Sequence, residues 1–436
     1  MKNVSAQIVG WLKSDDLLRH SGILFSGMMV VHVCNVLYQM AVSRALPSEE
    51  YALLAAFLGV LTMIQRPLST LTTGISHYSS LLQRNGRTGD VKRLLRKWML
   101  LAGVPSMACG LVVVLFHQSL SAFLHLERMA PVVITGLALP ALFLLPVLGG
   151  AANGLQFIKW SSASTIAGAF LRLGLGAGFV WFLYPACGWA MLGHGAGIYV
   201  SVLLLLLGLS LMLRGHGKSQ LPLPSIRLYV LQSFLIQAAY GVLMNADVVL
   251  VKHYVPEDLE FAYAATLGRL VVFLPGAIVT AMFPKVASTG NATLYQRMVF
   301  YRSFRYTVLC VCAAVAGCFL FPGLLVRILF GMTEASDSLK QMIGLMAVVM
   351  SFSALLNVVV QFLLAQRRCK PALCILVFAG LYIAATCYLH ATSWMIVWVS
   401  AFCNALALLV LFMYVARMIR SEEKRCEVKE NEYGHE

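Results

Sequence analysis

The stretch NADVVLVKHYVPEDLEFAYAATLGRLVVFLPGAIVTAMFPK, from Asn245 to Lys285, decides the fold. Two apolar runs flank a short acidic turn, so the pattern predicts the end of one membrane helix and a complete second one. Asp247 and Arg269 interrupt these two runs. A charge at the centre of a membrane span costs about 2.5 to 3.5 kcal/mol on insertion scales, so such residues mark candidate functional sites.

The composition indicates an integral membrane protein. Of the 436 residues, 60% are hydrophobic and only 12% are charged, and the mean hydropathy is +0.80. Apolar runs of about 20 residues, the length of a membrane-spanning helix, recur throughout. The net charge of +15 fits basic cytoplasmic loops better than nucleic-acid binding. The eleven Cys lack metal-ligand spacing, and we expect neither a metal site nor a cofactor.

Hydropathy predicts twelve spans, and the basic residues orient them. The spans are 21–43, 51–82, 98–116, 129–154, 161–184, 190–213, 228–252, 262–284, 304–328, 340–366, 371–390 and 393–416. Most of the 33 Lys and Arg fall in every second loop, which places both termini in the cytoplasm. We expect a multi-pass protein of a bacterial cytoplasmic membrane.

The two halves of the sequence resemble each other weakly. LPSEEYALLAAFLGVL (Leu46–Leu61) aligns with VPEDLEFAYAATLGRL (Val255–Leu270), which pairs Glu49 with Asp258. We therefore predict an N-terminal six-helix bundle (1–213), a cytoplasmic linker (214–226), a C-terminal six-helix bundle (227–418) and a charged tail (419–436) that is disordered from Ser421 onward. Such a doubled set of six helices is typical of secondary transporters, with the substrate site between the halves.

Polar and charged residues inside the spans are the candidate site. Away from the ends of the spans, the basic residues are Arg66, Arg172 and Arg269, and the single acidic one is Asp247. Asp247 and Arg269 are each roughly 11 Å from the outer end of their helices at about 1.5 Å per residue, so we predict that they touch. In the first span Asn35, Tyr38 and Gln39 share one helical face. We interpret these residues as lining a cationic central cavity.

Structural interpretations of the same residues stay open. Asp247 and Arg269 could neutralise each other as a purely structural pair. Arg66, next to Pro67, could bind carbonyl groups released at a helix kink. Arg172 precedes a glycine-rich run and could bind a neighbouring helix or a lipid phosphate.

Enzymatic motifs are absent from the sequence. It contains no GxSxG, HExxH or P-loop motif, and no pair of carboxylates within the spans. We therefore expect a transporter and not an enzyme. A membrane scaffold in a polysaccharide-synthesis complex is a further interpretation that the sequence leaves open.

Four features of the sequence form a combination: the six-plus-six plan, the Asp247–His253 segment, the acidic turn with its aromatic neighbour, and Phe283–Pro284–Lys285 at the end of the eighth span. In this combination the chain resembles the oligosaccharide flippases of the multidrug/oligosaccharidyl-lipid/polysaccharide (MOP) exporter superfamily. The resemblance implies an all-α, MATE-like fold of two pseudo-symmetric six-helix bundles around a central cavity.

The resemblance also implies a function and a set of partners. The expected substrate is a polyprenyl-diphosphate-linked oligosaccharide, translocated by alternating access, with a proton or Na⁺ as coupling ion. Arg66 and Arg269, and less directly Arg172, would hold the anionic head group, with Asp247 positioning Arg269 or binding the coupling ion. Membrane lipids, a polysaccharide polymerase and glycosyltransferases are the expected partners of a monomer. The rival interpretation is a cation-coupled multidrug exporter of the MATE type.

Overall fold

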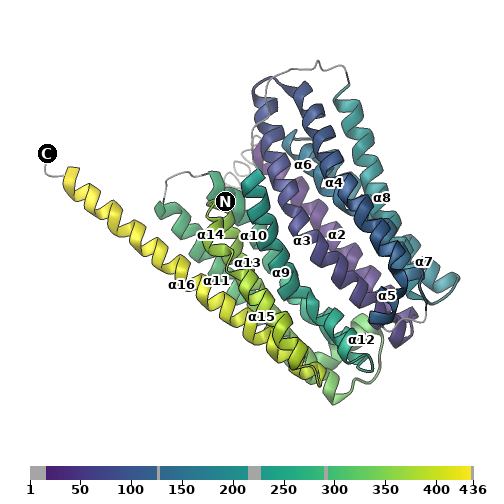
Figure 1. The fold of residues 1–436 in the computed structure, drawn as a ribbon. Coiled ribbons are helices and arrows are strands. Elements are labelled where there is room, and N and C mark those ends of the chain that lie inside the picture. The colour runs from purple at the N-terminus through teal and green to yellow at the C-terminus, as the bar shows by residue number, and fades with distance from the viewer. Residues whose placement is uncertain (1–15, 125–127, 215–226, 289–292, 434–436) are drawn as a thin grey trace, which may run out of the picture. The chain divides into compact units, whose positions relative to one another are not determined.

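The computed structural model describes residues 16–124, 128–214, 227–288 and 293–433, which form helices joined by turns and short loops (Figure 1). Ten helices in this part are long and apolar enough to cross a membrane. Two further helices, α2 (Asp16–Ala45) and α10 (Glu260–Ser288), occupy the remaining predicted spans and are 30 and 29 residues long. The predicted all-helical membrane architecture is confirmed, whereas the count of twelve is not reproduced in full. Most of the predicted linker lies outside the described residues.

The chain divides into two compact units, of which the first contains most of the N-terminal half. Its helices are α2, α3 (Ser48–Arg84), α4 (Thr88–Leu115), α5 (His117–Phe123), α6 (Ala130–Gly154), α7 (Ile158–Phe182) and α8 (Cys187–Met212). In this unit α7 packs against α2 and α8, and α6 packs against α4 and α8 (Figure 1). Val147, Leu148 and Ala151 of α6 are fully buried and form part of its core.

The second unit is built around one nearly buried helix, α13. Its helices are α9 (Arg227–Tyr254), α10, α11 (Thr293–Leu320), α12 (Pro322–Phe330), α13 (Asp337–Ala365), α14 (Cys369–Ala372), α15 (Ile375–Tyr388) and α16 (Ser393–Tyr433). α13 packs against α10, α11 and α16. The Ser336 hydroxyl accepts a hydrogen bond from the Leu339 N–H at 3.0 Å and so caps the first turn of this helix.

The middle of α3 belongs to the second unit, although the sequence places all of α3 in the first bundle. Residues Ala55–Pro67 group with the C-terminal helices. Two glycines allow this segment to approach α9 closely. A Cβ on Gly59 would lie 3.4 Å from the carbonyl oxygen of Asn245, and one on Gly241 would lie 3.1 Å from that of Met63. The close approach brings Arg66 into the second unit.

The predicted ninth span, 304–328, is interrupted in the structure. α11 ends at Leu320 and the short α12 begins at Pro322. Proline has no N–H group and disfavours helical geometry at the residue before it, so Phe321 is not helical and separates α11 from α12. The first unit has the same element order, since the long α4 is followed by the short α5.

The prediction of a disordered tail is wrong for most of its length. α16 continues from the membrane span through Ser421 to Tyr433. The extension from Ser421 to Tyr433 consists largely of Glu, Lys and Arg, which favour helix formation. It contains neither Gly nor Pro.

A carboxylate binds a helix start in each unit. The backbone N–H of Cys187, at the start of α8, donates to Glu50 Oε2 at 2.6 Å. In the second unit Asp258 accepts hydrogen bonds from Phe261 N at 3.1 Å and from the hydroxyl of Ser393, at the start of α16. The sequence alignment pairs Asp258 with Glu49, but Glu50 makes the equivalent contact. Negative groups are favoured at helix N-termini because the N–H groups there are unpaired.

Replacing Asp258 by alanine is therefore expected to lower the free energy of unfolding by about 1 to 2 kcal/mol, because two hydrogen bonds and a helix cap are lost. Thermal unfolding of the purified protein in detergent measures this effect. Glu257→Ala, which changes an exposed neighbouring carboxylate, is the matched control and should leave the melting temperature unchanged. Equal melting temperatures for both variants would contradict the capping role.

Candidate functional site

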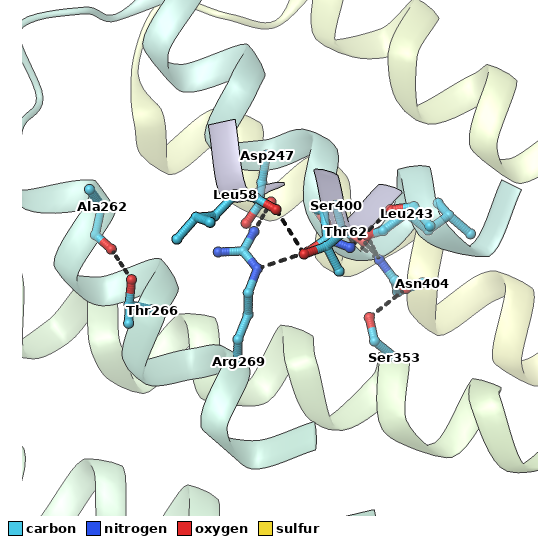
Figure 2. Close-up of polar contacts among 12 residues, drawn as sticks. Leu58, Thr62, Leu243, Asp247, Ala262, Thr266, Arg269, Ser353, Ser400 and Asn404 are labelled. Atoms are coloured by element: carbon cyan, nitrogen blue, oxygen red, sulfur yellow. Dashed lines mark hydrogen bonds and ion pairs between the residues drawn. The ribbon is translucent and has the colours of Figure 1, made fainter. Parts of the chain in front are cut away.

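Asp247 and Arg269 are in contact in the second unit, as the sequence predicts. Arg269 Nη2 donates to Asp247 Oδ1, and Arg269 Nε donates to Asn245 Oδ1 at 3.2 Å. Figure 2 shows the Arg269 side chain extending from α10 toward Asp247 on α9. The Asp247 side chain is 4% exposed and that of Arg269 is 17% exposed. Pairing matters here because an isolated buried charge is strongly destabilising.

The α9–α10 hairpin brings the two residues to a similar depth. Asp247 lies about two turns before α9 ends at Tyr254, and Arg269 lies between two and three turns after α10 begins at Glu260. The second carboxylate oxygen, Asp247 Oδ2, is buried and has no hydrogen-bond partner among the described residues. This oxygen therefore keeps a lone pair that is able to bind a proton or a small cation.

Arg66 contacts the same helix as Arg269 does. Its Nη2 lies 3.3 Å from the sulfur of Met244, and its guanidinium carbon lies 5.3 Å from the centre of the Tyr240 ring. A cation within about 6 Å of an aromatic ring centre is attracted to the ring. The Tyr240 hydroxyl donates to the carbonyl oxygen of Ser353 at 3.0 Å, which holds the ring in place. Arg66 and Arg269 therefore both lie against α9, within about two turns of each other.

In the first unit, Arg172 contacts two of the three polar residues predicted on the first span. Its Nη1 donates to Asn35 Oδ1 at 3.0 Å, and its guanidinium carbon lies 4.2 Å from the centre of the Tyr38 ring. Tyr38 is fully buried, and its hydroxyl donates to the carbonyl oxygen of Ala190 at 3.0 Å. The third predicted residue, Gln39, donates instead to the Tyr51 hydroxyl, from its Nε2 at 2.8 Å.

The structure thus distributes the predicted site residues over two units. Arg66, Asp247 and Arg269 belong to the second unit, and the remaining four, Asn35, Tyr38, Gln39 and Arg172, belong to the first. That any of them binds substrate stays a prediction, as does the central cavity.

Sequence reasoning missed Asn404, which organises polar contacts in the second unit. Asn404 is fully buried in α16, and its Nδ2 donates to the carbonyl oxygens of Leu243 at 3.2 Å and Ser400 at 2.9 Å. Its Oδ1 accepts from the Ser353 hydroxyl at 2.9 Å (Figure 2). These contacts link α9, α13 and α16 close to the Asp247–Arg269 pair. The available signal was the single side-chain amide in the twelfth span.

His194 is the second residue that sequence reasoning missed. It lies on α8 and is 7% exposed. Both of its ring nitrogens are buried and have no hydrogen-bond partner among the described residues. A histidine between two glycines in the sixth span, in the sequence GHGAG, was the available signal.

Comparison with solved structures identifies the fold. An inward-facing multidrug resistance MATE family transporter of the MOP superfamily matches with a TM-score of 0.65, 15% identity and coverage of 92% of this chain and 98% of the other. An outward-facing transporter of that family matches with a TM-score of 0.66, 14% identity and coverage of 93% and 96%. A MATE structure in complex with MaD3S matches with a TM-score of 0.67, 13% identity and coverage of 93% of this chain and 96% of the other. No protein-family model and no curated protein sequence matches the chain.

The protein is therefore a multi-pass helical membrane protein with the fold of the MATE transporters of the MOP superfamily. The similarity extends over nearly the whole of both chains, so the fold prediction is confirmed. At this level of identity the comparison establishes the fold.

Proposed function

We propose that the protein translocates a polyprenyl-diphosphate-linked oligosaccharide across the bacterial cytoplasmic membrane by alternating access, with both termini in the cytoplasm. The charge of the spans is the observation that carries this proposal. Away from their ends the spans contain three arginines and one carboxylate, and that carboxylate is paired with one of the arginines. The resulting positive potential favours an anionic substrate and disfavours a cationic one.

Arginine is suited to a diphosphate group. Its guanidinium stays charged at all physiological pH values and offers parallel N–H donors to phosphate oxygens. In the proposed mechanism Arg66 and Arg269 bind the head group, and both already lie against α9. Asp247 holds Arg269 in position through the ion pair, and its Oδ2, which has no partner among the described residues, accepts the coupling proton or Na⁺.

Replacing Arg66 or Arg269 by alanine is expected to reduce export at least tenfold, because a charge-assisted contact to phosphate contributes about 1.5 to 3 kcal/mol. Lysine at position 66 should recover part of the activity, since it keeps the charge and loses the paired donors. The measurement is the accumulation of lipid-linked glycan in the inner leaflet of cells that depend on this protein. Arg128→Ala is the matched control, because Arg128 stacks on Tyr184 in an exposed position. Normal export by both alanine variants would refute the site assignment.

Export of small organic molecules coupled to a cation is the second candidate function. It is favoured by the solved structures with this fold, which include multidrug resistance transporters. Cells that express the protein should be tested for resistance to cationic and anionic drugs in parallel with glycan export. Resistance to cationic drugs that persists in the Arg66→Ala variant, without any glycan phenotype, would favour this function over the flippase.

A further inference from the structure

The first unit contains a half-buried arginine, Arg172, that has no carboxylate partner among the described residues. The contacts of Arg172 are the amide oxygen of Asn35 and the face of the Tyr38 ring, both of which are electrically neutral. Among the described residues its buried Nε has no hydrogen-bond partner, and no carboxylate forms an ion pair with Arg172. A charge that is largely withdrawn from water is destabilising when it has no counter-charge. An anion bound at Arg172 Nε would supply that counter-charge.

His194 lies on the face of α8 that meets Arg172. Gly197, one turn further along this helix, approaches α7 so closely that an added Cβ would lie 3.0 Å from Arg172 Cβ. The carbonyl oxygen of Ala190, one turn before His194, accepts the hydrogen bond of the Tyr38 hydroxyl. The Arg172 guanidinium stacks on the ring of the same tyrosine. Residues separated by three and four positions share a helix face, so His194 lies between these two contacts. One of its ring nitrogens carries an N–H in either neutral tautomer and so offers a second unused donor.

We propose that Arg172 and His194 form a buried binding site for a small inorganic anion of the halide type. The anion would accept hydrogen bonds from Arg172 Nε–H and from the imidazole N–H, and it would neutralise the guanidinium. This site is separate from the head-group contacts proposed for Arg66 and Arg269 in the second unit, and it does not depend on the substrate.

The packing around the site favours a ligand of one or a few atoms. The Tyr38 ring lies against Gly176, where an added Cβ would be 2.6 Å from Tyr38 Cε2. Tyr38 is fully buried and His194 is 7% exposed, so close-packed side chains surround the site. A multiply charged phosphate would lose far more hydration energy on entering these surroundings than a halide would.

The test uses the purified full-length protein in detergent, without glycolipid. Sodium gluconate is replaced stepwise by sodium chloride or sodium bromide at constant ionic strength, and the melting temperature is followed. A ligand that binds only the folded state stabilises it, so we expect a saturable rise of about 3 °C or more. Arg172→Gln should abolish the rise. His194→Leu, which keeps a side chain of similar size but removes the N–H donor, should raise the half-saturating halide concentration about tenfold, in line with the loss of one hydrogen bond to a charged group.

Two further variants keep the test decisive. Arg172→Lys keeps the charge without the Nε donor and should also lose at least tenfold in halide affinity, which covers the case in which Arg172→Gln does not fold. Arg128→Gln changes another arginine of the first unit that stacks on a tyrosine, and it should respond to halide as the wild type does.

Three results would overturn the proposal. One is an equal melting temperature of the wild type in gluconate and in halide. Another is a halide response that survives in both Arg172 variants. The third is stabilisation only by vesicles containing phosphatidylglycerol, lost in Arg172→Gln, which would assign the site to a lipid phosphate. Because no glycolipid is present, none of these results depends on the proposed transport function.

Discussion

Replacing Asp247 by asparagine is expected to destabilise the second unit by about 3 to 5 kcal/mol, because the Arg269 charge then stays largely buried without its counter-charge. Asparagine preserves the shape of the side chain, so the loss reports the charge and not a cavity. The measurement is thermal unfolding of the purified variant in detergent, where a lower melting temperature is expected. The Asp337–Lys340 pair provides the control, because Asp337 is 89% exposed and its replacement by asparagine should leave the melting temperature unchanged.

The double variant Asp247→Asn, Arg269→Gln tests whether the loss comes from the pair. Removing both charges leaves no unpaired ion, so the double variant should be more stable than Asp247→Asn alone. A double variant that is as unstable as the sum of the two single variants would refute the coupling. A stable double variant that no longer transports would show that the pair acts in transport as well as in folding.

Replacing Gly176 by alanine is expected to disrupt the first unit, whereas the same change at Gly174 or Gly178 should be tolerated. At Gly176 the new Cβ would lie 2.6 Å from the Tyr38 ring and 3.4 Å from the carbonyl oxygen of Ala190. Nothing lies within 4 Å of a Cβ added at Gly174 or Gly178. We expect a loss of about 1 to 3 kcal/mol for Gly176→Ala, the usual cost of overpacking a core. The other two variants should gain up to about 1 kcal/mol from the higher helix propensity of alanine.

This series contains its own controls, because all three substitutions are identical and lie within five residues of α7. The readout is again the melting temperature, supplemented by the halide response, since displacement of the Tyr38 ring disturbs its stacking with Arg172. Equal melting temperatures for the three variants would contradict the close approach of Tyr38 to Gly176.

The sequence by itself determined the helices and one contact of the candidate site. Hydropathy locates the spans because each must cover the bilayer with apolar side chains, a requirement that depends on local sequence. The Asp247–Arg269 pair could be predicted because one short turn connects their helices, so distance from the turn sets depth. Two helix boundaries still differ from the hydropathy prediction. Pro322 divides a predicted span, and the charged tail continues as helix.

Only the tertiary structure decided which polar groups meet across helices far apart in the sequence. Hydropathy and spacing show that Arg172, Tyr38 and His194 lie inside spans, but the rotation of each helix about its axis follows from packing against its neighbours. That packing depends on small residues such as Gly176, and the sequence does not distinguish this glycine from Gly174 and Gly178. The same holds for the middle of α3, which joins the second unit and brings Arg66 to α9. Local sequence thus sets how deep a side chain lies, whereas close contact between helix surfaces sets which partner it meets.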